Sequence, residues 1–165
     1  MNKKRFIVTI ITSAYFIYYA LTYKDWHFID TVNLIIHEAG HIIFLPFGTF
    51  MHILGGSLWQ VLFPIIFVLY FLKQRDYFSA SLVLFWVGQN LLNVSVYASD
   101  SIVMQLPLLG GDTAGHDWHN ILTMLGMLKY TYVIGSSIYF AGIVAIASAV
   151  SLCLVYSFSE NDLVS

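Results

Sequence analysis

The chain has 165 residues, of which 59% are hydrophobic, 17% aromatic and only 10% charged, with a formal net charge of −2. Its mean hydropathy of +0.78 is well above that of soluble domains, and its charge offers no basic face to nucleic acid. A single cysteine excludes an internal disulfide and a cysteine-rich metal site. The composition predicts an all-α integral membrane protein, one domain over residues 1–165, that contacts membrane lipid and binds no nucleic acid.

Five segments are apolar enough to cross a membrane as helices of about 20 residues. They cover residues 6–23, 31–47, 57–72, 77–99 and 130–158. Glycines and prolines mark residues 100–129 as a loop, in which helical spacing from Trp118 predicts a short interfacial helix. The stretch "FGTFMHILGGSLWQ" after the second helix is too short for a span and predicts a re-entrant or hairpin loop. The chain is thus expected to be a multi-pass protein of a bacterial-type cell membrane.

The basic residues give an expected orientation. Residues 3–5 are Lys-Lys-Arg, which favours a cytoplasmic N-terminus. Five crossings then place Lys129 on the cytoplasmic side and Lys24, Lys73 and Arg75 on the opposite side. In this arrangement the C-terminal ends of the second and fourth helices share the cytoplasmic side.

The second helix carries "HEAGH", in which His37 and His41 are separated by one helical turn. Both imidazoles therefore point the same way and are spaced to hold one tetrahedral cation. Glu38 is suited to take a proton from a water on that cation, which is the H-E-x-x-H arrangement of zinc hydrolases. An ionisable group at membrane depth costs about 2.5–3.5 kcal/mol, so these residues are functional candidates.

A third zinc ligand has two candidate sources. On the fourth helix, Gln89, Asn93, Tyr97 and Asp100 fall on one face, and Asp100 at its end is the expected ligand. The rival is the loop stretch "GGDTAGHDWHN", which concentrates metal-capable side chains.

Within that loop stretch, His116 and Asp117 are expected to support a ligand histidine or to replace Asp100. Asp112 and His119 belong to the same cluster. Asp117 could also be the N-cap of the helix that begins at Trp118.

Residues 31–100 resemble the site-2 protease class of intramembrane zinc metalloproteases, the M50 type, as a remote or reduced branch. "HEAGH" stands where these proteases have H-E-x-x-H, and "NVSVYASD" stands where they have an Asn-containing segment leading to a ligand aspartate. Their usual Leu-Asp-Gly is replaced here by Ser-Asp-Ser. The resemblance implies a three-helix core, a Zn²⁺ ion and a transmembrane or membrane-proximal protein substrate. It also implies that residues 50–54 pair as a strand with the unwinding substrate.

The expected reaction is zinc-dependent peptide-bond hydrolysis within or beside the membrane, with Glu38 as general base. Asn93, or a donor in the loop at Gly55 and Gly56, is expected to stabilise the oxyanion. The alternative is a non-hydrolytic membrane protein in which protein ligands fill all four positions of a structural or sensory zinc site.

Overall fold

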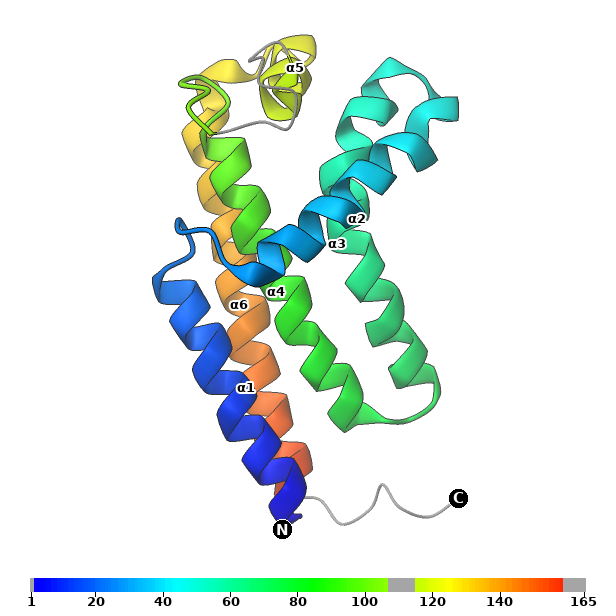
Figure 1. The fold of residues 1–165 in the computed structure, drawn as a ribbon, viewed down its shortest axis with the longest axis vertical. Helices are drawn as coiled ribbons and strands as arrows, with labels where there is room; N and C mark the ends of the chain where they lie inside the picture. Colours follow the sequence, from blue (N-terminus) through cyan, green and yellow to red (C-terminus); the bar gives the residue numbers. More distant parts are fainter. Residues whose placement is uncertain (1, 107–114, 159–165) are drawn as a thin grey trace.

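A computed structural model describes residues 2–106 and 115–158, and this part of the chain folds entirely into helices and their connections (Figure 1). The elements are α1 (Lys3–Leu21), α2 (Phe28–Phe44), the 3₁₀ turn η1 (Leu45–Phe47), α3 (Thr49–Lys73), α4 (Tyr77–Ser99), α5 (Asp117–Met124), the 3₁₀ turn η3 (Leu128–Tyr130) and α6 (Thr131–Phe158).

Four helical segments of the described chain are long and apolar enough to cross a membrane. They are Phe28–Phe47, Thr49–Lys73, Tyr77–Ser99 and Leu128–Phe158. α1 forms as a helix but is not among these four, whereas the sequence analysis expected five crossings. The chain is therefore a helical, multi-pass type of membrane protein.

The connection between α2 and α3 differs from the predicted hairpin or re-entrant loop. It consists only of η1 and Gly48, whose φ of 92° lies in the left-handed region that glycine adopts without strain. α3 then begins at Thr49 instead of residue 57. Because residues 50–54 are α-helical, the prediction that they act as a strand is also wrong. Gly55 and Gly56, the two glycines that suggested a loop, lie within α3. They are tolerated there because both lie in close contact with α2, where a side chain would not fit.

The core of the molecule is a bundle of α1, α4 and α6 (Figure 1). Aromatic side chains dominate its centre: Phe16 stacks on Phe85 with ring centroids 5.2 Å apart, and Tyr19 is fully buried. α2 leaves the middle of this bundle obliquely and continues upward, and α3 returns beside α4 (Figure 1). α2 and α3 thus form a helical hairpin that leans away from the α1–α4–α6 bundle at its upper end.

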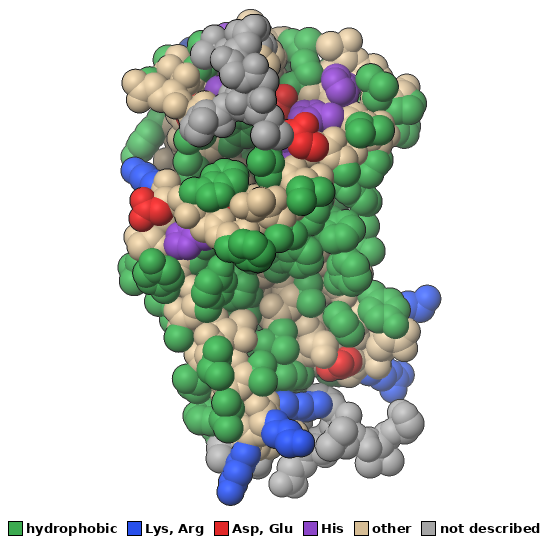
Figure 2. Space-filling model, viewed as in Figure 1, with side chains coloured by type: hydrophobic (Ala, Val, Ile, Leu, Met, Phe, Trp, Pro, Cys, Tyr) green, Lys and Arg blue, Asp and Glu red, His purple; other side chains and the backbone are tan. Residues whose placement is uncertain are grey.

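This path of α2 changes the expected distribution of the basic residues. The guanidinium of Arg5 lies 5.1 Å from the ring centroid of Phe78 at the start of α4, and the backbone N–H of Asn2 donates to the carbonyl of Ser157. The N-terminus and the α3–α4 loop, with Lys73 and Arg75, therefore share one end of the molecule. Figure 2 shows most of the lysine and arginine side chains at that lower end. The prediction that these two clusters lie on opposite sides is wrong, because α1 and α2 run toward the same end.

The hairpin depends on a close approach of two helix backbones, at Gly40 of α2 and Gly55 of α3. A Cβ at Gly40 would collide with the carbonyl oxygen of Gly55 and lie 2.7 Å from Cβ of Trp59. A Cβ at Gly55 would lie 2.7 Å from the carbonyl oxygen of Gly40. Small residues at such crossings are what let membrane helices pack backbone to backbone.

We expect Gly40→Ala to destabilise the protein by about 1–3 kcal/mol, because the added methyl group must push α3 away. Thermal unfolding of the purified protein in detergent measures this effect. The matched control is Gly115→Ala, where an added Cβ meets no heavy atom within 4 Å. Equal unfolding temperatures for the two variants would contradict the close-packing account.

Candidate metal centre

The two histidines of "HEAGH" lie on the face of α2 that packs against α3. His37 is buried and His41 half-buried, whereas Glu38 is exposed on the neighbouring face. The imidazole rings of His37 and His41 have centroids 4.9 Å apart. The one-turn spacing of these residues therefore brings the two rings together, as their sequence separation predicts.

Asp117, at the start of α5, completes a group of three possible ligands. Its Oδ2 atom lies 3.0 Å from Nε2 of His37 and 3.3 Å from Nε2 of His41. One ligand atom from each residue lies within 4.8 Å of the others, and the three side chains are buried or half-buried. Ligand atoms bound tetrahedrally at about 2.0–2.2 Å are separated by roughly 3.3–3.6 Å, close to these distances.

The other ring nitrogen of His41 is held by the backbone of α3. Nδ1 of His41 lies 2.8 Å from the carbonyl oxygen of His52, which can only accept a hydrogen bond. His41 therefore carries a proton on Nδ1, which leaves Nε2 as the ring nitrogen that faces Asp117 and can bind a metal ion. The ring of His52 returns the contact, because its Nδ1 donates to the carbonyl of His41 at 2.9 Å.

A relay of amides holds His37 in the same tautomer. The Asp30 carboxylate accepts from Nδ2 of Asn93, Oδ1 of Asn93 accepts from Nε2 of Gln60, and Oε1 of Gln60 lies 3.1 Å from Nδ1 of His37. Because the carboxylate accepts, each amide in turn has only one possible orientation. His37 must therefore donate from Nδ1, which leaves Nε2 as the ring nitrogen that faces Asp117 and can bind a metal ion.

Asp30 is well suited to begin this relay. It is buried, and it also accepts hydrogen bonds from the Tyr19 hydroxyl, the Gln89 amide and the backbone N–H of His27. All its partners donate, as an ionised carboxylate requires.

Three possible ligand atoms thus converge on one point. Nε2 of His37, Nε2 of His41 and Oδ2 of Asp117 can approach this closely only with positive charge between them, either protons on the two imidazoles or a metal ion that replaces those protons. Gly56 of α3 provides the room, because a Cβ there would collide with Nε2 of His37 and lie 2.6 Å from Nε2 of His41. The donor set, the fixed tautomers and this missing Cβ fit a metal ion held by the three side chains.

α5 is fixed in position by contacts with α3 and α4. The backbone N–H of Asp117 donates to the Tyr97 hydroxyl at 2.9 Å, and Nε1 of Trp118 donates to the Ser57 hydroxyl at 3.0 Å. The residue that caps α5 is His116, whose Nδ1 accepts from the backbone N–H of His119. The prediction that Asp117 is the N-cap is therefore wrong, and its carboxylate is free to face the histidines.

Asp100, the expected third zinc ligand, does not lie beside His37 and His41. At the end of α4 it accepts hydrogen bonds from the backbone N–H groups of Gln105 and Leu106, and its Oδ2 lies 3.3 Å from Nε2 of the fully buried His116. Asp100 is not in the group with His37 and His41, and Asp117 stands there instead. The contact with Asp100 thus holds His116, the residue that directly precedes Asp117, in place. Asp112, from the same loop cluster, lies outside the described residues.

Electrostatics favour a charged Asp117. Burial raises the pKa of its carboxyl group, but the hydrogen bonds and charges of His37 and His41 outweigh burial and hold the pKa below its ordinary value. The cluster therefore offers one negative charge to a cation.

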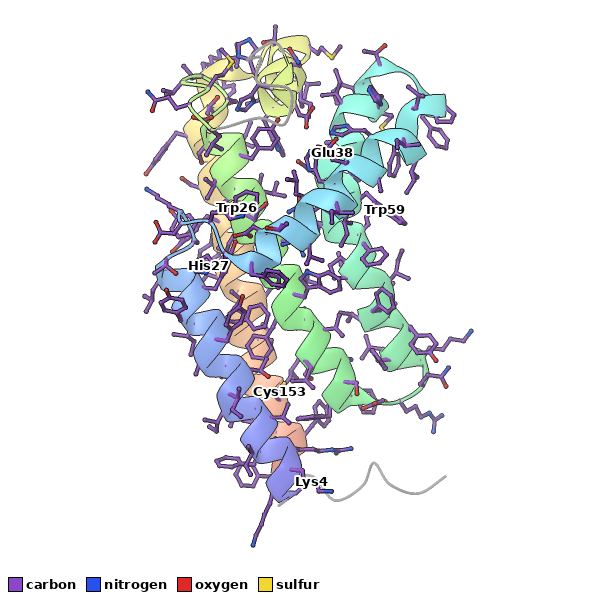
Figure 3. The ribbon with its side chains drawn as sticks, in the orientation of Figure 1. Lys4, Trp26, His27, Glu38, Trp59 and Cys153 are labelled. Carbon is purple, nitrogen blue, oxygen red and sulfur yellow. The ribbon has the colours of Figure 1, made fainter. Side chains whose placement is uncertain are left out.

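Two cavities adjoin the cluster, and Glu38 lines both. Figure 3 shows the position of Glu38 on the upper part of α2. The larger, about 640 Å³, extends from Lys24 and Asp25 in the α1–α2 loop to His37, Glu38 and Asp117. The smaller, about 330 Å³, lies on the side of His52 and Asn120. Asn93 lines the larger cavity while both ends of its amide belong to the relay, so its role toward an oxyanion stays a prediction.

Sequence reasoning missed the relay that supports His37. A signal was present: Asp30, Asn33, His37 and His41 are spaced by three, four and four residues, which puts four polar groups on one face of an apolar helix. Gln60 is likewise an isolated amide in a long apolar stretch. Buried polar groups of this kind require partners, so their common face predicts a network.

Comparisons of this chain with known proteins identify no related protein. No family model, no curated protein and no solved structure matches this chain.

We expect Asp117→Ala to abolish metal binding as completely as His41→Ala, because each removes one of three ligand atoms. Asp100→Ala should weaken binding by only roughly 10- to 100-fold, since it removes a residue that holds the ligand segment in place. Elemental analysis and competition titration with zinc as the probe metal measure both effects. Asp76→Ala, at the far end of α4, is the control aspartate. Retention of full zinc by Asp117→Ala with loss in Asp100→Ala would reverse the assignment.

We expect Gly56→Ala to lower zinc affinity by at least about 10-fold without loss of helix content. Alanine favours a helix over glycine by about 1 kcal/mol, so any loss reflects the methyl group placed against the two Nε2 atoms. Circular dichroism and zinc titration separate the two effects. Gly115→Ala, which also lines both cavities, should bind zinc normally. Unchanged affinity in Gly56→Ala would exclude a metal at this point.

Proposed function

We propose that this chain is a zinc-dependent peptidase that cleaves peptide bonds within or beside the membrane. The observation that supports this most directly is the convergence of His37, His41 and Asp117 with the exposed carboxylate of Glu38 beside them, at a cavity. Two imidazoles and one carboxylate are the protein ligands of several catalytic zinc sites.

The roles of the residues follow from their positions. A zinc ion with an open position lowers the pKa of water that it binds to about 7 and polarises a substrate carbonyl group. Glu38 is next to His37 in sequence and lines both cavities, so its carboxylate accepts the proton of the attacking water and delivers it to the leaving amine. His37 and His41 would hold the metal through their Nε2 atoms, since Gln60 and the backbone of His52 bind their Nδ1 atoms.

The larger cavity supports a chain-like substrate. At about 640 Å³ it has the size of a pocket for a short segment instead of a folded domain. It lies among helices that are long and apolar enough to cross a membrane, and apolar residues such as Leu34, Val94 and Leu106 line part of it. We propose that it receives an unwound segment of a transmembrane or membrane-proximal protein.

The alternative is a structural or sensory zinc site. Such sites fill four positions with protein ligands. Within the described residues the group has three members, and His116, the further candidate from the same loop stretch, is paired with Asp100. An open fourth position favours the enzyme.

We expect Glu38→Gln to keep its zinc and to lose at least about 100-fold in cleavage rate, because an amide cannot accept the proton. The assay co-reconstitutes the zinc-loaded protein in liposomes with a pool of single-span model helices and reads the products by mass spectrometry.

Asp76→Asn serves as the control in this assay, since it changes an acidic residue at the other end of α4, outside both cavities. Turnover of Glu38→Gln near that of the unaltered chain would refute the role of Glu38. Absence of product from the zinc-loaded unaltered chain would favour the structural or sensory site.

A further inference from the structure

The charges of the molecule are divided between its two ends. The chain has seven lysines and arginines, and all of them lie in the described residues. Five gather at the end that holds the N-terminus and the α3–α4 loop, shown at the bottom of Figure 2: Lys3, Lys4, Arg5, Lys73 and Arg75. Lys24 and Lys129 lie away from that end.

The metal centre lies at the opposite end. α4 begins at Tyr77 beside Arg5 and reaches Asp100 after 23 residues, about 34 Å at the rise of an α-helix. This length matches the hydrocarbon thickness of a membrane, about 30 Å. Asp100 contacts His116, which directly precedes Asp117, so the site adjoins the end of α4 that is remote from the five basic residues.

Short loops on the cytoplasmic side of membrane proteins carry an excess of lysine and arginine, whereas acidic residues have little influence. The end with five basic residues, including a cluster of three at the N-terminus, is thus the cytoplasmic one. We propose that the His37–His41–Asp117 site faces away from the cytoplasm, and that it acts on extracytoplasmic or outer-leaflet segments of membrane proteins. The substrate part of this proposal rests on the proposed peptidase function.

The large cavity is consistent with entry from that side. It joins the metal centre to Lys24 and Asp25, which follow the 19 residues of α1. At 1.5 Å per residue, α1 brings these two charged residues about 28 Å from the basic end. Their charges therefore lie well away from the basic end, on the way to the metal centre, where water and a polar chain can enter the cavity.

The orientation is tested by cysteine labelling in spheroplasts of a bacterial expression host. Cys153, the single native cysteine, is buried and is replaced by serine in the parent. Met124→Cys on the exposed part of α5 and Gln74→Cys in the α3–α4 loop each introduce one accessible thiol. Zinc content equal to that of the unaltered chain shows that the parent and both variants are folded.

We expect a membrane-impermeant maleimide to label Met124→Cys in intact spheroplasts and Gln74→Cys only after permeabilisation. The reverse pattern, or equal labelling of both before permeabilisation, would overturn the proposal. The labelling result does not depend on catalysis, so it stands even if the peptidase function fails.

The substrate side is tested with two model helices that carry the same cleavable segment at opposite membrane faces. Products from the outward-facing segment alone support the proposal, and products from the inward-facing segment alone overturn it. No product from either, with the labelling pattern as expected, removes the peptidase function and leaves the orientation.

Discussion

The contact between the backbones of α2 and α3 determines how the site is built. Gly40 and Gly55 let the helices approach until a Cβ on either would collide with the other helix, and Gly56 leaves room beside the imidazoles. At this separation the His52 carbonyl reaches His41 and the Gln60 amide reaches His37. A wider crossing would lose both hydrogen bonds, and with them the fixed direction of the two Nε2 atoms.

Polar groups in an apolar environment must find partners, and here their partners also order the site. The carboxylate of Asp30 on α2 is buried, and it accepts hydrogen bonds from Tyr19 on α1, from Gln89 on α4 and from the backbone N–H of the residue that caps α2. Hydrogen bonds through Asn93 and Gln60 connect this carboxylate to His37, two turns further along α2. Because the carboxylate can only accept, the chain of hydrogen bonds makes Nδ1 of His37 the donor. The cost of burying this network is offset by its hydrogen bonds. The same hydrogen bonds connect the core to the candidate metal centre and fix the orientation of the His37 ring.

The helical, membrane-spanning character and the pairing of His37 with His41 could be predicted, because both depend on local composition and on spacing within one helix. The third ligand could not. Asp100 and Asp117 both stand in plausible positions along the chain, and only the contacts of α5 with Tyr97 and Ser57 bring Asp117 to the histidines. The direction of α2 relative to α1 could not be predicted from hydropathy either. Hydropathy indicates how many segments can cross a membrane, but it does not show that a helix leaves the bundle obliquely.

His37 and Asp117 lie 80 residues apart in the chain, and this separation has a consequence for biogenesis. Synthesis proceeds from the N-terminus, so α2 and α3 emerge with both imidazoles before α5 exists. The hairpin holds those rings through His52 and Gln60 without help from the later chain. Two imidazoles alone bind a cation loosely, so firm binding of a metal ion by this group would require α5 to dock first. Metal loading would then be the closing event of assembly, and a chain truncated before α5 would carry the motif without the third ligand.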